Sequence, residues 1–524
     1  MNYTFLSAAL FLISVLFKTG ENILKNKIVI KLKLDLTNKL IRKFYSLDLG
    51  FFQAKSVGEN VYRLSDTDNI ATFITDRLPC MFVDIFKILT ILGLTLWLNL
   101  PMSLFLLILS PFFVLHSLYL QKKIRPIQEQ IWKHSVELSK KIHEAFSKIL
   151  VIKTSGYESF QRRSYLRFLI KNIRWQIRSF RYSVIGSLTA PFLSKAIAGI
   201  VALYGGWLII KGRLSLGSYT AIMLYLSQLS MLLQSLVHRL EYVARDIITF
   251  EKFFEVMETA PKIKDSTGAK HLKSIKGEIQ FKNVWFGYQR EKPVLRELDF
   301  IIPSCLWIGI AGPSGCGKTT LANLILRLYE PWRGEISLDG TDLQMIKIES
   351  LRKNVAIATQ QPLLFDLSIR ENIGYGLGNI SETRIIEAAK IVQIHDFING
   401  LPKGYNTFIG EDACKLSGGL KQRIAIARAI IRNPYILILD EATSSVDSLT
   451  EQKIFQALRE KRQGLSTIVI SHRLSAIKDA DRIYFLRDDG QIGAGLHSQL
   501  LSGNAFYRDF FTLPENISND AAYI

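Results

Sequence analysis

Gly312-Pro-Ser-Gly-Cys-Gly-Lys-Thr-Thr320 matches the pattern G-x-x-x-x-G-K-[ST] and follows the apolar run Leu306-Trp-Ile-Gly-Ile-Ala311. The apolar run predicts a buried strand, and the residues 320–328 predict the helix after the loop. Glycines in such a strand–loop–helix context let successive backbone N–H groups point into one concavity, which binds phosphate oxygens at a helix N-terminus. The stretch therefore predicts a binding site for a nucleoside triphosphate.

The loop assigns separate roles to its side chains. Lys318 is expected to reach the β- and γ-phosphates, and the Thr319 hydroxyl is expected to coordinate Mg²⁺. The predicted nucleotide-binding residues of this loop are Gly312, Ser314, Gly315, Cys316, Gly317, Lys318, Thr319 and Thr320.

Composition divides the 524 residues into two halves. Long apolar runs interrupted by basic stretches dominate the first half, which predicts an α-helical transmembrane domain, while the second half has the mixed pattern of an α/β domain. We expect a membrane domain at 1–256, a linker at 257–275, a nucleotide-binding domain at 276–515 and a tail at 516–524. The runs that approach the length a bilayer demands are Phe5–Phe17, Cys80–Leu98, Met102–Leu120, Ile185–Ile210 and Tyr219–Leu236.

The net charge of +20 fits a membrane protein better than a nucleic-acid-binding one. Lys and Arg are concentrated in Lys18–Arg77 and Gln121–Arg181, two long segments that each lie between predicted spans. The connections on the other side are short: Asn99–Pro101, and Lys211–Leu216 with two basic residues. By the positive-inside rule, both long segments are cytoplasmic, so the protein is expected to be multi-pass, in the plasma (inner) membrane, with a cytoplasmic ATP-binding domain. Five spans then place Met1 outside, and the odd count suggests that a first span is missing.

A second motif supplies the acidic side chains that phosphate chemistry needs. Tyr435-Ile-Leu-Ile-Leu-Asp440-Glu441 predicts a buried strand that ends in two carboxylates. Asp440 is expected to hold Mg²⁺, and Glu441 to act as the general base that polarises the attacking water. Leu416-Ser-Gly-Gly-Leu-Lys-Gln-Arg423 predicts another anion-binding helix N-terminus, although an ordinary N-cap would have the same local sequence.

Taken in order, seven motifs between about Gly277 and Leu501 resemble the ATP-binding domain of ABC transporters. They are Tyr288, the phosphate loop, Gln360, Leu416–Gly419, Asp440-Glu441, Ser444–Asp447 and His472. The resemblance implies that Tyr288 stacks on adenine, that Gln360 touches Mg²⁺ and the attacking water, and that His472 contacts the γ-phosphate. It further implies that Ser417, Gly418, Gly419 and Asp447 bind nucleotide. From local sequence alone, Tyr288, Gln360 and His472 would be a packing aromatic, a loop amide and a structural histidine.

The same resemblance implies a dimer, because one copy cannot complete a site. ATP is expected between the phosphate loop of one subunit and Ser417–Gly419 of the other, and the partner is a second copy or a sister half-transporter. Phe51–Arg63, Ile152–Glu158 and Gly212–Gly217 resemble loops of the exporter-type membrane domain, in which the usual first span would be absent here.

We therefore expect an ATP-hydrolysing ABC exporter of an unidentified substrate. An ATP-driven regulator or gated channel on the same fold, and an importer with exporter architecture, remain the alternatives.

Charged and polar residues within the predicted spans are candidates for binding the substrate, and each also has a structural explanation. Lys195 is either a site for an anionic substrate or a side chain that snorkels to the interface. Asp84 and Lys87 are expected to pair with each other at i,i+3. The polar stretch Gln228–Ser235 fits either a cavity lining or hydrogen bonds between helices.

Overall fold

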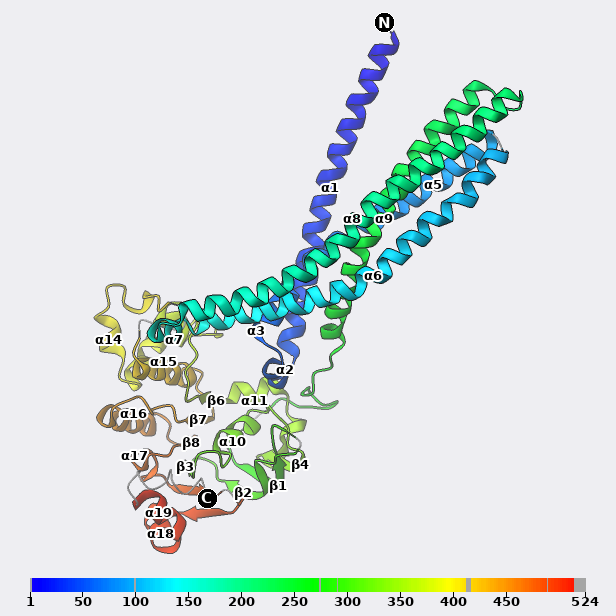
Figure 1. Cartoon of the computed structure of the whole chain (residues 1–524). Helices are drawn as coiled ribbons and strands as arrows, with labels where there is room; N and C mark the ends of the chain where they lie inside the picture. The colour runs from blue at the N-terminus through cyan, green and yellow to red at the C-terminus, as the bar shows by residue number, and fades with distance from the viewer. Residues whose placement is uncertain are drawn as a thin grey trace. The chain divides into compact units, whose positions relative to one another are not determined.

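The computed structural model of the chain describes residues 2–98, 100–272, 275–289, 291–410, 416–487 and 489–512. It divides the chain into two compact units, Met1–Pro261 and Lys262–Ile524. In its described part, the first unit consists of helices; the second contains all ten strands found there (Figure 1).

Four helices of the first unit, α1, α6, α8 and α9, are much longer than the predicted spans that they contain. The bounds are α1 Asn2–Ser46, α2 Leu49–Ala54, α3 Val57–Ser65, α4 Thr67–Thr72, the π-helix η1 Phe73–Arg77, α5 Leu78–Leu98, α6 Leu100–Ser147, α7 Ile149–Ser155, α8 Glu158–Ile210 and α9 Leu216–Glu258. Within the described residues, three helical stretches are long and apolar enough to cross a bilayer: Val57–Leu98, Glu158–Ile210 and Leu216–Leu236. The predicted spans Phe5–Phe17 and Met102–Leu120 lie in α1 and α6, where many side chains fall outside the described residues.

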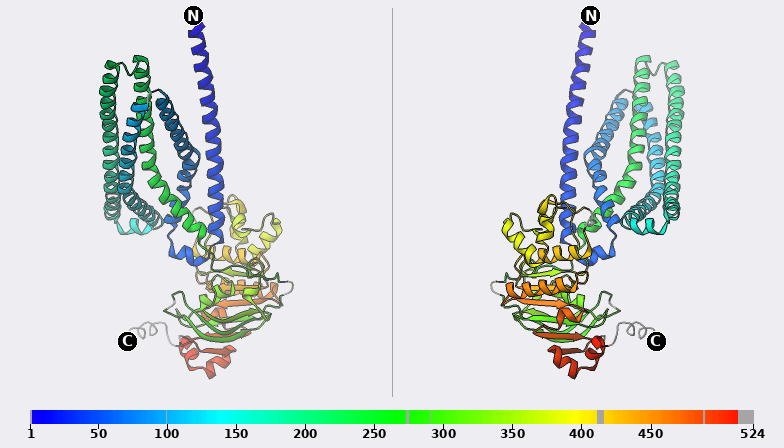
Figure 2. Two further views of the ribbon diagram at one scale, coloured as in Figure 1. Left: turned by 90° about the vertical axis from the view of Figure 1, so that its right-hand side faces the viewer. Right: turned by 90° about the vertical axis from the view of Figure 1, so that its left-hand side faces the viewer.

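Among the described residues, two large apolar clusters and a small one at Leu120 and Ile124 of α6 lie within this bundle. Helices α6 and α8 run side by side over much of their length (Figures 1 and 2). One cluster joins α5, α8 and α9 through Ile91, Val201 and Ile222. The other joins the ends of α1 and α9 to α4 through Leu40, Ile70 and Val256. The first cluster lies within candidate spans, where close packing rather than the hydrophobic effect stabilises helix contacts. Burial from water contributes about 1.5–3 kcal/mol for each side chain of the second cluster.

The expected pair between Asp84 and Lys87 is wrong. Asp84 is buried on α5 and accepts hydrogen bonds from Ser235 Oγ at 2.8 Å and Arg239 Nε at 3.1 Å, both on α9. A buried carboxylate is costly unless it is paired and hydrogen-bonded, and α9, which packs directly against α5, supplies both partners. Ser235 therefore donates a hydrogen bond between two helices. This is one of the two roles expected for the polar stretch Gln228–Ser235, the other being a cavity lining. Lys195 lies exposed on α8.

The second unit contains two sheets. Their strands are β1 Ile279–Phe286, β2 Leu295–Ile302, β3 Trp307–Ala311, β4 Arg333–Leu338, β5 Thr341–Asp342, β6 Val355–Ala358, β7 Ile436–Asp440, β8 Ser466–Ile470, β9 Arg482–Leu486 and β10 Ile492–Gly495. The smaller sheet has the order β2-β1-β4-β5, and the larger has the order β10-β9-β3-β8-β7-β6. In the larger sheet, β9, β3, β8, β7 and β6 are mutually parallel, whereas β10 is antiparallel to β9.

The helices of this unit flank the sheets and cap their connections. They are α10 Lys318–Ile325, η2 Leu343–Met345, α11 Ile348–Asn354, α12 Ile369–Ile373, α13 Glu382–Ile391, α14 His395–Asn399, η3 Gly404–Asn406, α15 Gly418–Ile430, α16 Ser448–Lys461, α17 Leu474–Ile477, α18 His497–Gly503 and α19 Ala505–Thr512.

The strands β3 and β7 explain why the predicted buried runs were recognisable. All five residues of each strand are buried, and alternate residues enter two different apolar clusters: Trp307 and Leu437 one, Ile308 and Ile438 the other. Side chains of a strand alternate between faces, so the two clusters cover opposite faces of the larger sheet. A parallel strand buried on both faces has a continuous apolar sequence.

The strand and helix around the phosphate loop are confirmed with shifted ends. The helix begins at Lys318 rather than Thr320, directly after Gly317, whose φ is +101°. It ends at Ile325 rather than Leu328, because Arg327 adopts a left-handed φ of +49° that no α-helix continues through.

Candidate functional site

Four loops that carry predicted site residues leave the same edge of the larger sheet. The phosphate loop follows β3, His472 follows β8, Glu441 follows β7 and Gln360 follows β6. These strands are neighbours in the order β3-β8-β7-β6 and all are parallel. Their carboxyl ends therefore meet at one edge, where open α/β sheets bind their ligands.

The phosphate loop closes around the lysine. Lys318 is buried, and its Nζ donates hydrogen bonds to the carbonyls of Gly312 and Pro313, both at 2.7 Å. Gly312 has a φ of +148°, and a Cβ there would lie 2.3 Å from the Leu486 carbonyl oxygen. Only glycine fits at this position, because a side chain would strain the backbone and displace β9.

Asp440 has the properties of a cation ligand. It is 2% exposed, accepts a hydrogen bond from the Thr319 side chain, and its Oδ1 has no hydrogen-bond partner among the described residues. Burial raises the pKa of Asp440, and the charge of Glu441 raises it further, while the Thr319 hydrogen bond and Lys318 oppose this. A buried carboxylate oxygen without a donor suits a divalent cation, which would favour the ionised form.

The chemistry of these donors is compatible with the predicted Mg²⁺. Within the described residues, no group of three or more His, Cys, Asp or Glu side chains could hold a metal by itself. Mg²⁺ is ordinarily bound through one or two carboxylates, with phosphate oxygens and waters completing its shell. Thr319 and Asp440 meet that requirement beside a phosphate loop.

Glu441 is held between the two other predicted catalytic residues. Its Oε2 accepts a hydrogen bond from Gln360 Nε2 at 2.6 Å, and its Oε1 lies 3.2 Å from His472 Nδ1. Glu441 has a φ of +47°, uncommon for a residue with a side chain, and its backbone N–H bonds the Ile470 carbonyl. This turn takes the Glu441 carboxylate out of the strand direction, so the structure brings all three residues together.

Tyr288 lies beside the helix that follows the phosphate loop. Its hydroxyl is 3.2 Å from Thr320 Oγ1 and accepts from Asn323 Nδ2 at 3.2 Å. Its ring meets the edge of Tyr329 with 5.2 Å between centroids, and 48% of the residue is exposed. An adenine-stacking role for Tyr288 stays a prediction.

Ser417–Gly419 begins α15, as the sequence predicted. Ser417 Oγ accepts from the Leu420 N–H at 3.4 Å, so Ser417 is the N-cap. The start of this helix rests on Ser445, and Asp447 caps α16 by accepting from the Thr450 N–H at 2.9 Å. That hydrogen bond lowers the pKa of Asp447. Nucleotide-binding roles for Ser417, Gly418, Gly419 and Asp447 stay predictions. Residues 411–415, which precede this helix in the sequence, lie outside the residues that the structure describes.

Gln422 and Glu451 are two buried site residues that the sequence argument did not single out. Gln422 donates to the Gln360 carbonyl and to Ser444 Oγ, and accepts from the Ser445 N–H at 2.8 Å. Glu451 accepts from the hydroxyls of Thr443 and Ser475. These hydrogen bonds hold residues 443–445, the segment that follows Glu441, in place. The only sequence signal of Gln422 and Glu451 is a polar residue on the apolar face of a helix.

Adding one methyl group at Gly419 is expected to disturb this arrangement. A Cβ at Gly419 would lie 2.7 Å from the Ser445 carbonyl oxygen, whereas one at Gly418 would meet the Ser445 side chain at 3.3 Å. Overpacking of this kind costs about 1–3 kcal/mol of folding free energy. Relief by movement of Ser445 would displace the segment that follows Glu441, so Gly419→Ala should lower ATPase activity by roughly ten-fold, which equals about 1.4 kcal/mol in the activation free energy, and Gly418→Ala by less. Gly503→Ala, which meets nothing within 4 Å, is the control in the same phosphate-release assay. Equal activities for Gly419→Ala and the control would contradict the expectation.

The fold and this site define a phosphate-loop ATPase joined to a helical membrane domain. The ABC transporter family matches residues 295–444, and the ABC transporter transmembrane region matches residues 1–233. The chain is 32% identical to an ATP-dependent lipid A-core flippase of Syntrophus aciditrophicus, over 90% of this chain and 79% of the relative. It is 31% identical to a fatty acid ABC transporter ATP-binding/permease protein of Mycobacterium tuberculosis, over 96% of this chain and 79% of the relative.

The chain thus belongs to the ABC transporter family. A bacterial Atm1-family ABC exporter solved with ATP bound matches the structure with a TM-score of 0.90 at 29% identity, covering 95% of this chain and 88% of that one. The protein is an ATP-hydrolysing ABC exporter subunit with one membrane half and one ATP-binding half, which confirms the expected class and fold.

Proposed function

We propose that two copies of this chain form the working exporter, with each ATP bound between the phosphate loop of one copy and Ser417–Gly419 of the other. Each chain carries both halves of such a site. The N-terminus of α15 begins with two glycines that carry no side chains, and the backbone N–H groups and the dipole at a helix N-terminus suit an anion. A sister half-transporter as partner is the alternative.

The contact of Glu441 with Gln360 and His472 carries the catalytic part of the proposal. Glu441 accepts the proton of the attacking water, and its two neighbours hold the carboxylate in one orientation. When bound through Thr319, Asp440 and Gln360, Mg²⁺ supplies positive charge to the phosphate oxygens. Lys318 adds positive charge on the same side.

The membrane part of the proposal sets the direction. The basic segments 18–77 and 121–181 lie on the cytoplasmic side of the plasma membrane together with the ATP-binding domain. ATP is consumed inside, and the substrate leaves toward the side of the short connections.

A cavity in the membrane half supports a proposal about the substrate. It has a volume of about 450 Å³ and lies among α3, α6, α8 and α9, lined by the aromatic residues Tyr62, Trp132, Phe180 and Tyr242 together with Arg245 and Gln176. Asp66 also lines it, but accepts hydrogen bonds from Trp132 Nε1 and Asn69 Nδ2. Among the described residues, no carboxylate lies within ion-pair distance of Arg245.

The charge of Arg245 acts on Asp66 in the same cavity and on the adjacent Asp246. Aromatic walls beside a cation suit an amphiphile that carries an anionic group. Two relatives are named for lipid A-core and for fatty acids, and both names fit this chemistry. We therefore propose that the exporter moves acidic amphiphiles.

Flux of a fluorescent fatty acid into inside-out vesicles tests this proposal. Uptake should require ATP and fail with Glu441→Gln, and Arg245→Gln should lower uptake by about ten-fold because a hydrogen bond to a charged group contributes about 1.5–3 kcal/mol. An uncharged alcohol of the same chain length is the comparison probe, and its uptake should not depend on Arg245. ATP-driven flux of neither probe would contradict the proposed substrate class, and equal loss of both would contradict the role of Arg245.

A further inference from the structure

The cytoplasmic extensions of two membrane helices meet around a buried arginine. Arg63 is in the last turn of α3, and only 4% of it is exposed. The helical stretch Val57–Leu98 continues from there into the span of α5. On the other side lies the final part of α9, which extends roughly 30 Å beyond Leu236 at 1.5 Å per residue before the boundary at Pro261.

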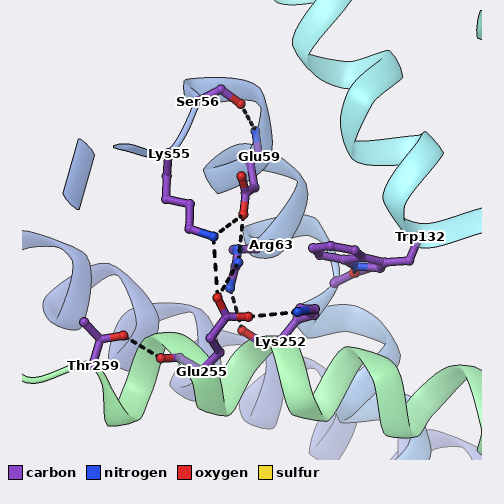
Figure 3. A network of polar contacts seen from close by, with 9 residues as sticks. Lys55, Ser56, Glu59, Arg63, Trp132, Lys252, Glu255 and Thr259 are labelled. Atoms are coloured by element: carbon purple, nitrogen blue, oxygen red, sulfur yellow. Dashed lines mark hydrogen bonds and ion pairs between the residues drawn. The ribbon is translucent and has the colours of Figure 1, made fainter. Parts of the chain in front are cut away.

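Arg63 is bound mainly by α9. Its Nη1 donates to the Lys252 backbone carbonyl at 2.8 Å, and its Nη2 donates to Glu59 Oε1 at 2.8 Å and Glu255 Oε1 at 3.3 Å (Figure 3). Burying a guanidinium group is costly unless acceptors surround it. Two of its three acceptors lie 189 and 192 residues away on α9. Glu59 of α3 alone would leave the guanidinium group with one acceptor, because the buried Nε has no hydrogen-bond partner among the described residues.

Further charges and one aromatic ring complete the contact. Lys55 lies 3.2 Å from Glu59 and 3.5 Å from Glu255, and Lys252 lies 3.0 Å from Glu255. Burial raises the pKa of Glu255, but Lys252, Arg63 and Lys55 outweigh this and lower it to about 2. Trp132 reaches in from α6, its ring centre 5.8 Å from the Arg63 guanidinium and 5.2 Å from Lys252 Nζ (Figure 3).

We propose that Arg63 is a positioning residue that locks the end of α9 to α3 and α6, so that movement of the ATP-binding domain passes through α9 into the spans. This inference rests on the proposed dimer, in which ATP brings the two ATP-binding domains together. The covalent connection from Glu258 to Lys262 is only a few residues long. When the ATP-binding domain moves, this connection displaces the end of α9. The Arg63 contact determines whether α3 and α5 move together with α9.

Trp132 extends the contact to the proposed substrate cavity. The same ring that lies beside Arg63 and Lys252 lines the cavity and donates its Nε1–H to Asp66. A molecule in the cavity thus touches a residue of the lock directly.

Spin-label distances between the two copies separate the lock from the dimer itself. Cys80, Cys305 and Cys414 are replaced, and the buried Cys316 of the phosphate loop is kept. A nitroxide is placed at Arg213→Cys in the short connection before α9 or at Lys403→Cys in the ATP-binding domain; both residues are exposed. In a Glu441→Gln background, ATP should shift both distance distributions. In Arg63→Gln, the Lys403 position should still respond, whereas the shift at Arg213 should be at least about two-fold smaller.

Two further variants keep the test decisive. Glu255→Gln leaves Arg63 its other two acceptors and should reduce the Arg213 response in the same direction, so it decides the question if Arg63→Gln does not fold. Arg125→Gln removes an exposed ion pair of 2.9 Å between α6 and Glu251 of α9 and should change neither label. A full Arg213 response in Arg63→Gln or Glu255→Gln would overturn the lock. Absence of an ATP response at Lys403 with Arg63 intact would instead overturn the proposed dimer.

Discussion

Glu441→Gln should lower the rate of ATP hydrolysis by roughly 10²–10⁴-fold, the usual contribution of a general base, while leaving ATP affinity within a few-fold of the unmodified protein. The amide has the same shape as the carboxylate and can still contact Gln360 and His472, but it accepts no proton at neutral pH. Phosphate release measures the first quantity, and equilibrium binding of labelled ATP measures the second.

An exposed acidic residue elsewhere in the ATP-binding domain provides the control for this variant. Glu460 is exposed in the same domain and contacts Gln456 through a side-chain hydrogen bond. Glu460→Gln should hydrolyse ATP normally. Hydrolysis by Glu441→Gln at the unmodified rate would show that another group is the base.

Lys318→Met should instead weaken ATP binding itself, by about 10- to 100-fold, because a hydrogen bond to a charged group contributes about 1.5–3 kcal/mol. Methionine keeps the apolar stem of the buried side chain and removes only the ammonium group. The same binding assay therefore separates the two variants: the dissociation constant rises for Lys318→Met and stays nearly constant for Glu441→Gln.

The Lys318→Met variant also tests whether the contacts of Lys318 within the phosphate loop stabilise the domain. Its Nζ contacts the carbonyls of Gly312 and Pro313, so its removal should also lower the unfolding temperature of the ATP-binding domain in the absence of nucleotide. A variant that binds ATP as tightly as the unmodified protein would contradict the predicted role of Lys318.

The phosphate-loop region could be predicted from sequence because its signals are short-range. A continuous apolar run, three glycines and a following helix lie within about twenty residues, and each has a local physical reason. The structure confirms β3 and α10 with shifts of a few residues. The helix end was misplaced because the left-handed Arg327 has no distinct sequence signal.

Contacts between distant residues were beyond local reasoning. Gln360 and Glu441 are 81 residues apart, and only the family resemblance placed them in one site. The pairing of Asp84 failed because the i,i+3 rule considers one helix, whereas the true partner Arg239 is 155 residues away. Arg63 appeared in the sequence as one more basic residue of a cytoplasmic segment.

Nucleotide concentration should also govern how long the ATP-binding domain survives in the cell. The loops that form its site leave one edge of a sheet whose two faces are covered by separate apolar clusters. A ligand at that edge binds only the folded domain, so ATP at a hundred times its dissociation constant adds about 2.7 kcal/mol to the free energy of unfolding. That corresponds to about a hundred-fold fewer unfolded domains open to proteases, and starved cells would lose this protection first.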